Sequence, residues 1–214
     1  MKKILAPILP CLLLLTGCKK SEQALTLNAN RQITLTLDDR YLEKIYPADE
    51  SDQSNSYSFC NSAPNCRAGY GAGYQLENDE EIYFRLGQLS SSQLPVSFEA
   101  FKSLFTPGVK TFDSLLVWGQ QSSNCVEVFY AEGTGKRWGS THIKSNSTAG
   151  SMVTRTVNQP GSSFVIESMK EITENNVSVG VKIKGRFNCI LYEEDGTRQK
   201  MVKDATFIAQ VMKW

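Results

Sequence analysis

The chemistry open to this chain is limited first by its single histidine. His142 is the only histidine among 214 residues. This excludes sites that need two, such as a 2-His-1-carboxylate iron centre or a zinc helix with two histidines. His142 also precedes Ile143 in a predicted strand, where a surface or edge histidine is more common than the base of a catalytic triad. We therefore assign no catalytic residue, and we expect no metal and no cofactor.

The stretch Gly133-Thr134-Gly135-Lys136 invites comparison with a phosphate-binding loop. Tyr130 stands where the first glycine of such a loop belongs, and Arg137 follows the lysine where Ser or Thr is needed. The stretch therefore predicts a hairpin turn between two strands.

A second glycine-rich stretch offers a candidate ligand-binding surface. Residues 69–74 have the sequence Gly-Tyr-Gly-Ala-Gly-Tyr. The glycines would let the backbone approach a ligand closely, and the tyrosines offer flat faces with a polar tip. One interpretation is a sugar-stacking platform, and the other is a loop whose tyrosines pack back onto a sheet. The candidate ligand-binding residues are Tyr70, Tyr74, Trp118 and Trp138.

Acidic residues gather in two segments that could supply oxygen ligands. Ca²⁺ takes about six to eight oxygens, often from acidic loops. Neither segment has EF-hand spacing, so solvated loops are the favoured interpretation. The first segment contains Asp38, Asp39, Asp49, Glu50 and Asp52, and the second contains Asn78, Asp79 and Glu80.

The start of the chain has the features of an export signal. Lys2 and Lys3 precede an apolar run over residues 4–15, which is shorter than the roughly 20 residues that span a bilayer. This pattern is typical of a secretory signal peptide. The run ends in Leu15-Thr16-Gly17-Cys18, which resembles the lipobox of bacterial lipoproteins.

The lipobox resemblance implies that Cys18 becomes the first residue of the mature chain. Its sulfur would carry a diacylglycerol and its amino group an acyl chain such as palmitate, and two or more acyl chains anchor a protein stably. Lys19, rather than aspartate, follows Cys18. In bacteria with two membranes this implies the outer membrane of the cell envelope, with the leaflet left open. The expected segments are a signal peptide over 1–17, a lipidated tether over 18–24 and one domain over 25–214.

Four further cysteines remain after Cys11 and Cys18 are set aside, and export to an oxidising compartment favours disulfide bonds. Cys60 and Cys66 flank a short, turn-rich loop, whereas Cys125 and Cys189 lie inside strand-like runs. Of the three possible pairings we expect Cys60 with Cys66 and Cys125 with Cys189. A zinc site is disfavoured because paired Cys-x-x-Cys knuckles are absent.

Beyond the tether, apolar and polar residues alternate, which predicts an all-β domain. Many short strands favour a single antiparallel β-sandwich, or a barrel-like sandwich. Apolar residues at helical spacing follow the capping residue Ser97, so we expect one short helix near 97–105. Residues 39–45 are expected to form a helical turn and residues 47–58 an exposed loop. The predicted strands are 25–27, 33–37, 81–86, 115–118, 125–130, 137–143, 163–169, 177–192 and 206–212.

The second half of the chain resembles families of uncharacterised bacterial envelope lipoproteins with a compact β-sandwich behind the lipid anchor. In those families a Gly-x-Phe strand, here Gly185-Arg186-Phe187, pairs with a final strand that carries another phenylalanine, here Phe207. The resemblance implies the fold and the location of the protein. It supplies no catalytic residue.

Charge and composition narrow the classes of partner. The formal net charge of the chain is +1, which argues against nucleic acid because neutralising phosphates needs clustered positive charge. We therefore expect a membrane-anchored, non-catalytic binding or structural module, with glycan or an envelope protein as partner. Two alternatives stay open, namely a hydrolase of envelope or dietary polymers and a subunit of an envelope or fimbrial assembly.

Overall fold

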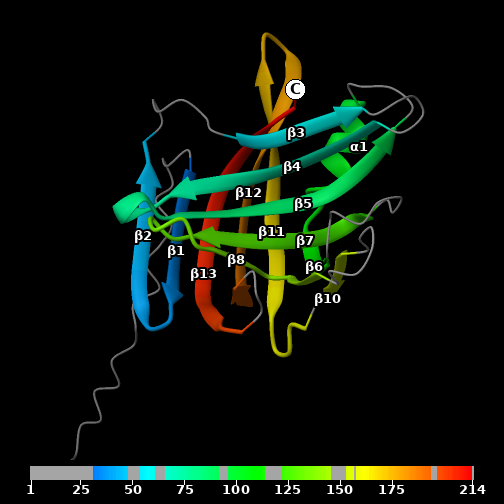
Figure 1. Cartoon of the computed structure of the whole chain (residues 1–214). Coiled ribbons are helices and arrows are strands. Elements are labelled where there is room, and N and C mark those ends of the chain that lie inside the picture. The colour runs from blue at the N-terminus through cyan, green and yellow to red at the C-terminus, as the bar shows by residue number, and fades with distance from the viewer. Residues whose placement is uncertain are drawn as a thin grey trace, which may run out of the picture.

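The computed structural model describes an all-β domain with one short α-helix (Figure 1). It describes residues 31–47, 54–60, 66–91, 96–113, 122–145, 153–156, 158–193 and 197–213. The expected signal peptide, the tether with Cys18, and the predicted strands 25–27 and 115–118 lie outside these residues. Within them, no helix has both the length and the apolar character that crossing a membrane requires.

Eleven strands form one sheet, and all of them except β8 follow one path of neighbours. Their order is β2-β1-β13-β12-β11-β6-β7-β5-β4-β3, and the short strand β8 pairs with both β12 and β7. The pairing of β6 with β7 is parallel, and β9 and β10 form a separate pair. The strands are β1 (Arg31–Leu37), β2 (Arg40–Tyr46), β3 (Ser54–Cys60), β4 (Cys66–Gln75), β5 (Glu81–Ser91), β6 (Gly108–Phe112), β7 (Ser122–Ala131), β8 (Arg137–Gly139), β9 (His142–Ser145), β10 (Val153–Thr156), β11 (Ser163–Glu174), β12 (Val177–Glu193) and β13 (Gln199–Met212).

The sheet folds over so that its two halves pack face to face as a sandwich. In Figure 1, β4, β5 and β7 run across the direction of β11, β12 and β13. Phe84 of β5 meets the rings of three phenylalanines from the other half, with centroid separations of 5.3 Å to Phe164, 6.4 Å to Phe187 and 4.7 Å to Phe207. All four rings are buried, so this aromatic cluster is the centre of the core.

The pairing of β12 with β13 explains the Gly-x-Phe sequence. Gly185 lies directly opposite Phe207. A Cβ at Gly185 would lie 2.4 Å from the carbonyl oxygen of Val165 and 2.6 Å from the Phe207 ring. The glycine therefore leaves room for the phenylalanine on the next strand, and it lies beside a register shift of the β11–β12 pair between Ile166 and Ser168.

Two local expectations were wrong. Residues 40–46 form strand β2, not a helical turn, because alternate side chains such as Leu42 and Tyr46 point into the core. A two-residue turn joins β1 to β2, with positive φ at Asp38 (47°) and Asp39 (68°), as hairpin turns of this kind require. The expected loop over 47–58 contains part of β3.

The helix prediction was confirmed. Helix α1 spans Phe98–Ser103, and the Ser97 hydroxyl accepts a hydrogen bond from the Ala100 N–H at 3.2 Å. Phe101, Leu104 and Phe105 are fully buried. The helix therefore closes one part of the core with its apolar side. A single 3₁₀ turn, η1 (Glu77–Asp79), connects β4 to β5.

Cys125 and Cys189 are both thiols in the structure, so the disulfide expected between them is not formed. Side chains alternate between the two faces of a strand. Cys189 lies on the core side of β12 and is 2% exposed, and burial raises the pKa of its thiol. Cys125 lies on the opposite side of β7 from the buried Val126, and its sulfur is 3.9 Å from a carboxylate oxygen of Asp113. The two sulfurs therefore face different environments.

The Cys60–Cys66 disulfide stays a prediction. The two residues are directly opposite each other in the β3–β4 ladder. Facing residues in an antiparallel pair have Cα atoms about 4.5–5.5 Å apart, which is within the range that a disulfide spans.

Candidate functional site

A polar hollow lies where two turns, η1 and the start of β13 come together. Its volume is about 530 Å³. The β1–β2 turn supplies Asp38, η1 contributes Asn78, the β7–β8 turn supplies Thr134, and β13 supplies Lys200. Tyr130, at the end of β7, also lines it. The hollow thus collects polar side chains from segments that are far apart in the sequence.

Close packing of the β7–β8 turn against η1 shapes this hollow. A Cβ at Gly133 would lie 2.2 Å from the carbonyl oxygen of Asn78. Asn78 itself has a positive φ of 56°, which asparagine tolerates better than most residues. Gly133 is therefore the residue that lets the two turns touch.

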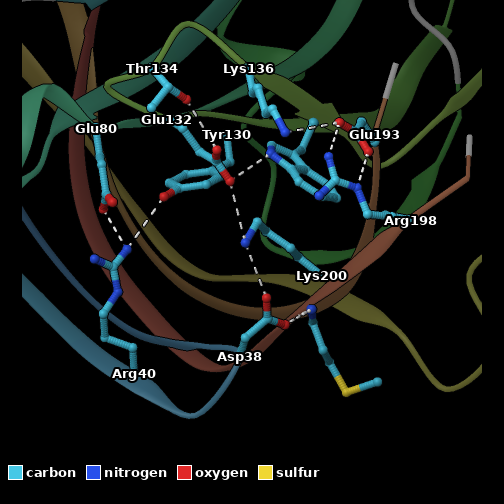
Figure 2. Close-up of polar contacts among 12 residues, drawn as sticks. Asp38, Arg40, Glu80, Tyr130, Glu132, Thr134, Lys136, Glu193, Arg198 and Lys200 are labelled. Atoms are coloured by element: carbon cyan, nitrogen blue, oxygen red, sulfur yellow. Dashed lines mark hydrogen bonds and ion pairs between the residues drawn. The ribbon is translucent and has the colours of Figure 1, made fainter. Parts of the chain in front are cut away.

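One side of the hollow is an ion pair beside a tyrosine. Arg40 lies 2.6 Å from the Glu80 carboxylate and donates to the Tyr130 hydroxyl at 3.4 Å (Figure 2). The hydrogen bond to Glu80 raises the pKa of Arg40. Burial, followed by the nearby Glu80 charge, raises the pKa of Tyr130 to about 12. Arg40 and Tyr130 therefore keep their protons at neutral pH.

The other side is built around Lys200. Its ammonium nitrogen is 3.3 Å from a carboxylate oxygen of Asp38 and 3.4 Å from one of Glu132. It also lies 4.8 Å from the centre of the Trp138 ring. The Trp138 N–H donates to the same Glu132 at 3.2 Å. Lys200 of β13 therefore links the β1–β2 turn to the β7–β8 turn. Asp38 also accepts a hydrogen bond from the backbone N–H of Met201 at 2.9 Å, which fixes the β1–β2 turn on β13.

The network continues along the rim through Glu193. This carboxylate pairs with Arg198 and lies 3.8 Å from the Lys136 ammonium (Figure 2). The Arg198 guanidinium lies 5.6 Å from the centre of the Trp138 ring. The cations Arg40, Lys136, Arg198 and Lys200 are matched by the carboxylates Asp38, Glu80, Glu132 and Glu193. We call these eight residues the ion network.

The expected sugar-stacking platform is not present on the surface. Residues 69–74 belong to strand β4, and Tyr70 and Tyr74 are 3% and 0% exposed. Tyr70 packs edge-on against Phe101 at 4.7 Å, and the Tyr74 hydroxyl donates to the Ile208 carbonyl at 2.9 Å. The alternative interpretation, tyrosines packed onto the sheet, describes them. Trp138 is also buried, and Trp118 lies outside the described residues.

The glycines of β4 serve strand packing. A Cβ at Gly71 would lie 2.0 Å from the carbonyl oxygen of Phe84 on the adjacent strand. This close approach requires glycine, and it is made to protein backbone instead of a ligand.

Some residues of each acidic segment lie at the hollow. Asp38, Asn78 and Glu80 all line it, whereas residues 49, 50 and 52 lie outside the described part of the chain. Lys200 and Arg40 sit beside the two carboxylates. Among the described residues, no group of three or more His, Cys, Asp or Glu side chains is arranged to hold a metal ion. His142 begins β9 and is placed opposite Thr156 of β10.

Sequence reasoning missed most of the ion network. Arg40, Glu132 and Lys200 come from β2, the β7–β8 turn and β13, so no local spacing connects them. One signal was available, because two aspartates between alternating apolar runs indicate a hairpin. That signal would have placed Asp38 in a turn and Arg40 at the start of the following strand.

Comparisons of the chain with protein-family models, with characterised proteins and with solved structures find no match. Arguments about function therefore use the residues of this chain alone.

Proposed function

We propose that this chain is a bacterial envelope lipoprotein, anchored by lipid on Cys18 to the outer membrane, with a non-catalytic domain that binds glycan. The sequence Leu15-Thr16-Gly17-Cys18 after a short apolar run supports the anchor. The polar hollow supports the binding function.

The observation that carries the binding proposal is the mixture of fixed donors and acceptors around one hollow. Arg40 and the Tyr130 hydroxyl stay protonated at neutral pH, because both pKa values are raised. Glu80 and Asp38 are hydrogen-bond acceptors beside them. A sugar hydroxyl both donates and accepts, so it needs donors and acceptors side by side.

The same electrostatics favour binding over acid–base catalysis. A general acid or base works best with a pKa near the operating pH. The resolved shifts at the hollow move Arg40 and Tyr130 further from neutrality. The carboxylates Asp38, Glu80 and Glu132 each have a cation within 3.4 Å, which suits them to holding a ligand.

The test is a glycan array probed with residues 19–214, which include every residue that the structure describes. Glu80→Gln keeps the shape of the side chain but removes its charge, and we expect at least about tenfold weaker binding because charged hydrogen bonds contribute most. The matched control is Lys102→Gln. It breaks the pair between Lys102 of helix α1 and Glu171 of β11, which has the same 2.6 Å separation.

Three outcomes would contradict this proposal. A folded chain that binds no sugar on the array argues against glycan as the ligand. Equal losses in Glu80→Gln and Lys102→Gln argue against the hollow as the site. Release of product from a glycan would favour the hydrolase alternative. The array is repeated with a calcium chelator, because loss of binding only under that condition would move the site to the acidic segments.

The anchor has a separate test. Cells that express the complete chain are grown with labelled palmitate, and the label should appear in the protein. Cys18→Ala should remove the label and leave the chain uncleaved. Label that persists in the Cys18→Ala chain would overturn this part of the proposal.

A further inference from the structure

The polar hollow is lined by more carboxylates than cations. The carboxylates are those of Asp38, Glu80 and Glu132. The cations are Arg40 and Lys200. The lining therefore carries one negative charge in excess, and this excess bears on the kind of sugar that the hollow would select.

The charged residues around the hollow do not cancel this excess. Among the described residues, those next to the lining are the carboxylates Asp39, Glu77, Asp79 and Glu193 and the cations Lys136, Arg198 and Lys203. Arg137 alternates with Trp138 along β8 and therefore points to the other face of the sheet, where its charge acts on Tyr83. Carboxylates thus outnumber cations both in the lining and around it.

Two of the lining carboxylates can accept further hydrogen bonds. A carboxylate has about four lone-pair positions. Asp38 accepts hydrogen bonds from Lys200 and from a backbone N–H of β13. Glu80 accepts one from Arg40 and lies beside the Tyr130 hydroxyl. Each of the two carboxylates therefore keeps acceptor positions for a ligand.

Asp38 is the more accessible of these two carboxylates. Its side chain is 44% exposed, whereas that of Glu80 is 13% exposed. Asp38 also lies farther from its cation, at 3.3 Å from Lys200 against 2.6 Å between Glu80 and Arg40. Asp38 is therefore the better placed of the two to bind a ligand.

An ammonium group matches this set of acceptors. It carries one positive charge and three N–H donors, and hydrogen bonds with a charged partner are about twice as strong as neutral ones. The amide oxygen of Asn78, which also lines the hollow, is a further acceptor. A hydroxyl group can donate to the same oxygens, but it leaves the excess negative charge in place.

We propose that the hollow selects a glycan with free amino groups and that Asp38 binds the ammonium group. This inference rests on the proposed glycan-binding function and deepens it by naming the class of sugar. Glucosamine has a free amino group, N-acetylglucosamine has a neutral amide in its place, and a uronic acid has a carboxylate. Affinity should therefore fall from aminated to neutral to acidic sugars.

The test is calorimetric titration of residues 19–214 with three tetrasaccharides, made of glucosamine, N-acetylglucosamine and galacturonic acid. At about pH 6 amines are protonated and ordinary carboxyl groups are ionised. We expect the glucosamine tetramer to bind at least about tenfold more tightly than its acetylated counterpart. This preference should shrink at high salt, because partly exposed charges are screened.

Asp38→Asn removes the charge but keeps an oxygen for the Met201 N–H, and asparagine accepts the positive φ of 47°. The preference for the glucosamine tetramer should fall below about threefold. Asp39→Asn is the matched control, because Asp39 lies in the same turn with a φ of 68°, is 89% exposed and does not line the hollow. It should keep the full preference. A variant that only disturbed the turn would bind both tetramers more weakly and keep their ratio.

Equal affinity for the glucosamine and N-acetylglucosamine tetramers would overturn this inference and leave the glycan-binding function standing. Tighter binding of the galacturonic acid tetramer would do the same. Full preference in a folded Asp38→Asn chain would overturn the role of Asp38. If the folded chain binds none of the three tetramers, the inference fails, and the glycan array decides separately whether other sugars bind. Circular dichroism spectra establish that each variant is folded.

Discussion

The ion network and the β11–β12 strand pair use similar residues in opposite ways. In the network, four cations pair with four carboxylates in three groups, which are centred on Glu80, Lys200 and Glu193. In the strand pair, Lys170 is directly opposite Lys182, and the Glu167 carboxylate lies close to Lys184 and Arg186. The difference teaches that opposite charges hold segments together at the hollow, whereas like charges at directly opposite positions cost a strand pair stability.

The largest expected effect is at the hollow. Gly133→Ala places a Cβ against the Asn78 carbonyl oxygen, which is backbone and must shift. We expect a loss of about 1–3 kcal/mol in the free energy of unfolding, as for other overpacking substitutions, measured by urea denaturation. Gly135→Asn is the control in the same turn. Gly135 has a φ of 85° with open space around it, and asparagine accepts that conformation. Equal stability of Gly133→Ala and the unmodified chain would show that the turn does not depend on this close contact.

A second prediction concerns a cation inside the molecule. Lys110 is 4% exposed beside Phe164, and burial lowers its pKa. The folded chain therefore holds fewer protons than the unfolded chain between the lowered pKa and about 10.5. Stability should rise with pH across that window.

Lys110→Met should stabilise the chain by more than about 1 kcal/mol at neutral pH, because burying a charge is costly, and should remove the rise with pH. Thermal unfolding from pH 7 to pH 10 measures both effects. A variant less stable than the unmodified chain would mean that the ammonium group makes a favourable contact. Lys110 would then stabilise the fold through its charge, as the residues of the ion network do.

The ion network gives a third prediction. Glu132→Gln removes the charge beside Lys200 but keeps an oxygen for the Trp138 N–H. We expect a loss of about 1 kcal/mol that shrinks at high salt, measured by chemical denaturation at two ionic strengths. A loss that is unchanged by salt would show that hydrogen bonding, not charge, dominates at this position.

The smallest effect has the opposite sign and lies in the β11–β12 strand pair. Lys182→Thr removes the repulsion with Lys170 and places a β-branched residue in a strand. We expect a gain of about 0.2–1 kcal/mol in the free energy of unfolding. Lys203→Thr, a strand lysine beside Asp39, is the control and should give no gain. Destabilisation by Lys182→Thr would remove the contrast between the two regions.

The core was predictable from the sequence, and the hollow was not. The alternation in residues 177–192 correctly predicted a strand, and Val181, Phe187 and Leu191 lie on its core side, because period-two patterns follow directly from strand geometry. Ser97 and the apolar spacing after it likewise located α1. These features depend on residues close together in the chain.

The failures involve contacts between distant segments or a wrong choice of period. The short segment 40–46 was assigned helical periodicity although its buried residues alternate. The tyrosines of 69–74 looked like a surface because glycines surround them, and only the pairing of β4 with β5 shows that the glycines admit a neighbouring strand. The Cys125–Cys189 pairing needed the facing direction of two strands, which sequence spacing does not contain.

The pairing of β1 with β13 has a consequence for how the chain is made. Thr34 and Thr206 share a hydrogen bond across 172 residues. Strand β1 therefore cannot complete its pairing until β13 has been synthesised. At a synthesis rate of roughly 5–20 residues per second, this wait is roughly ten to thirty seconds. During that time the partner edges of β1 and β12 stay open, and open edges are where chains associate wrongly. A nascent chain that stops before residue 199 would keep both edges open permanently. The closing strand therefore makes completeness of translation a condition for solubility.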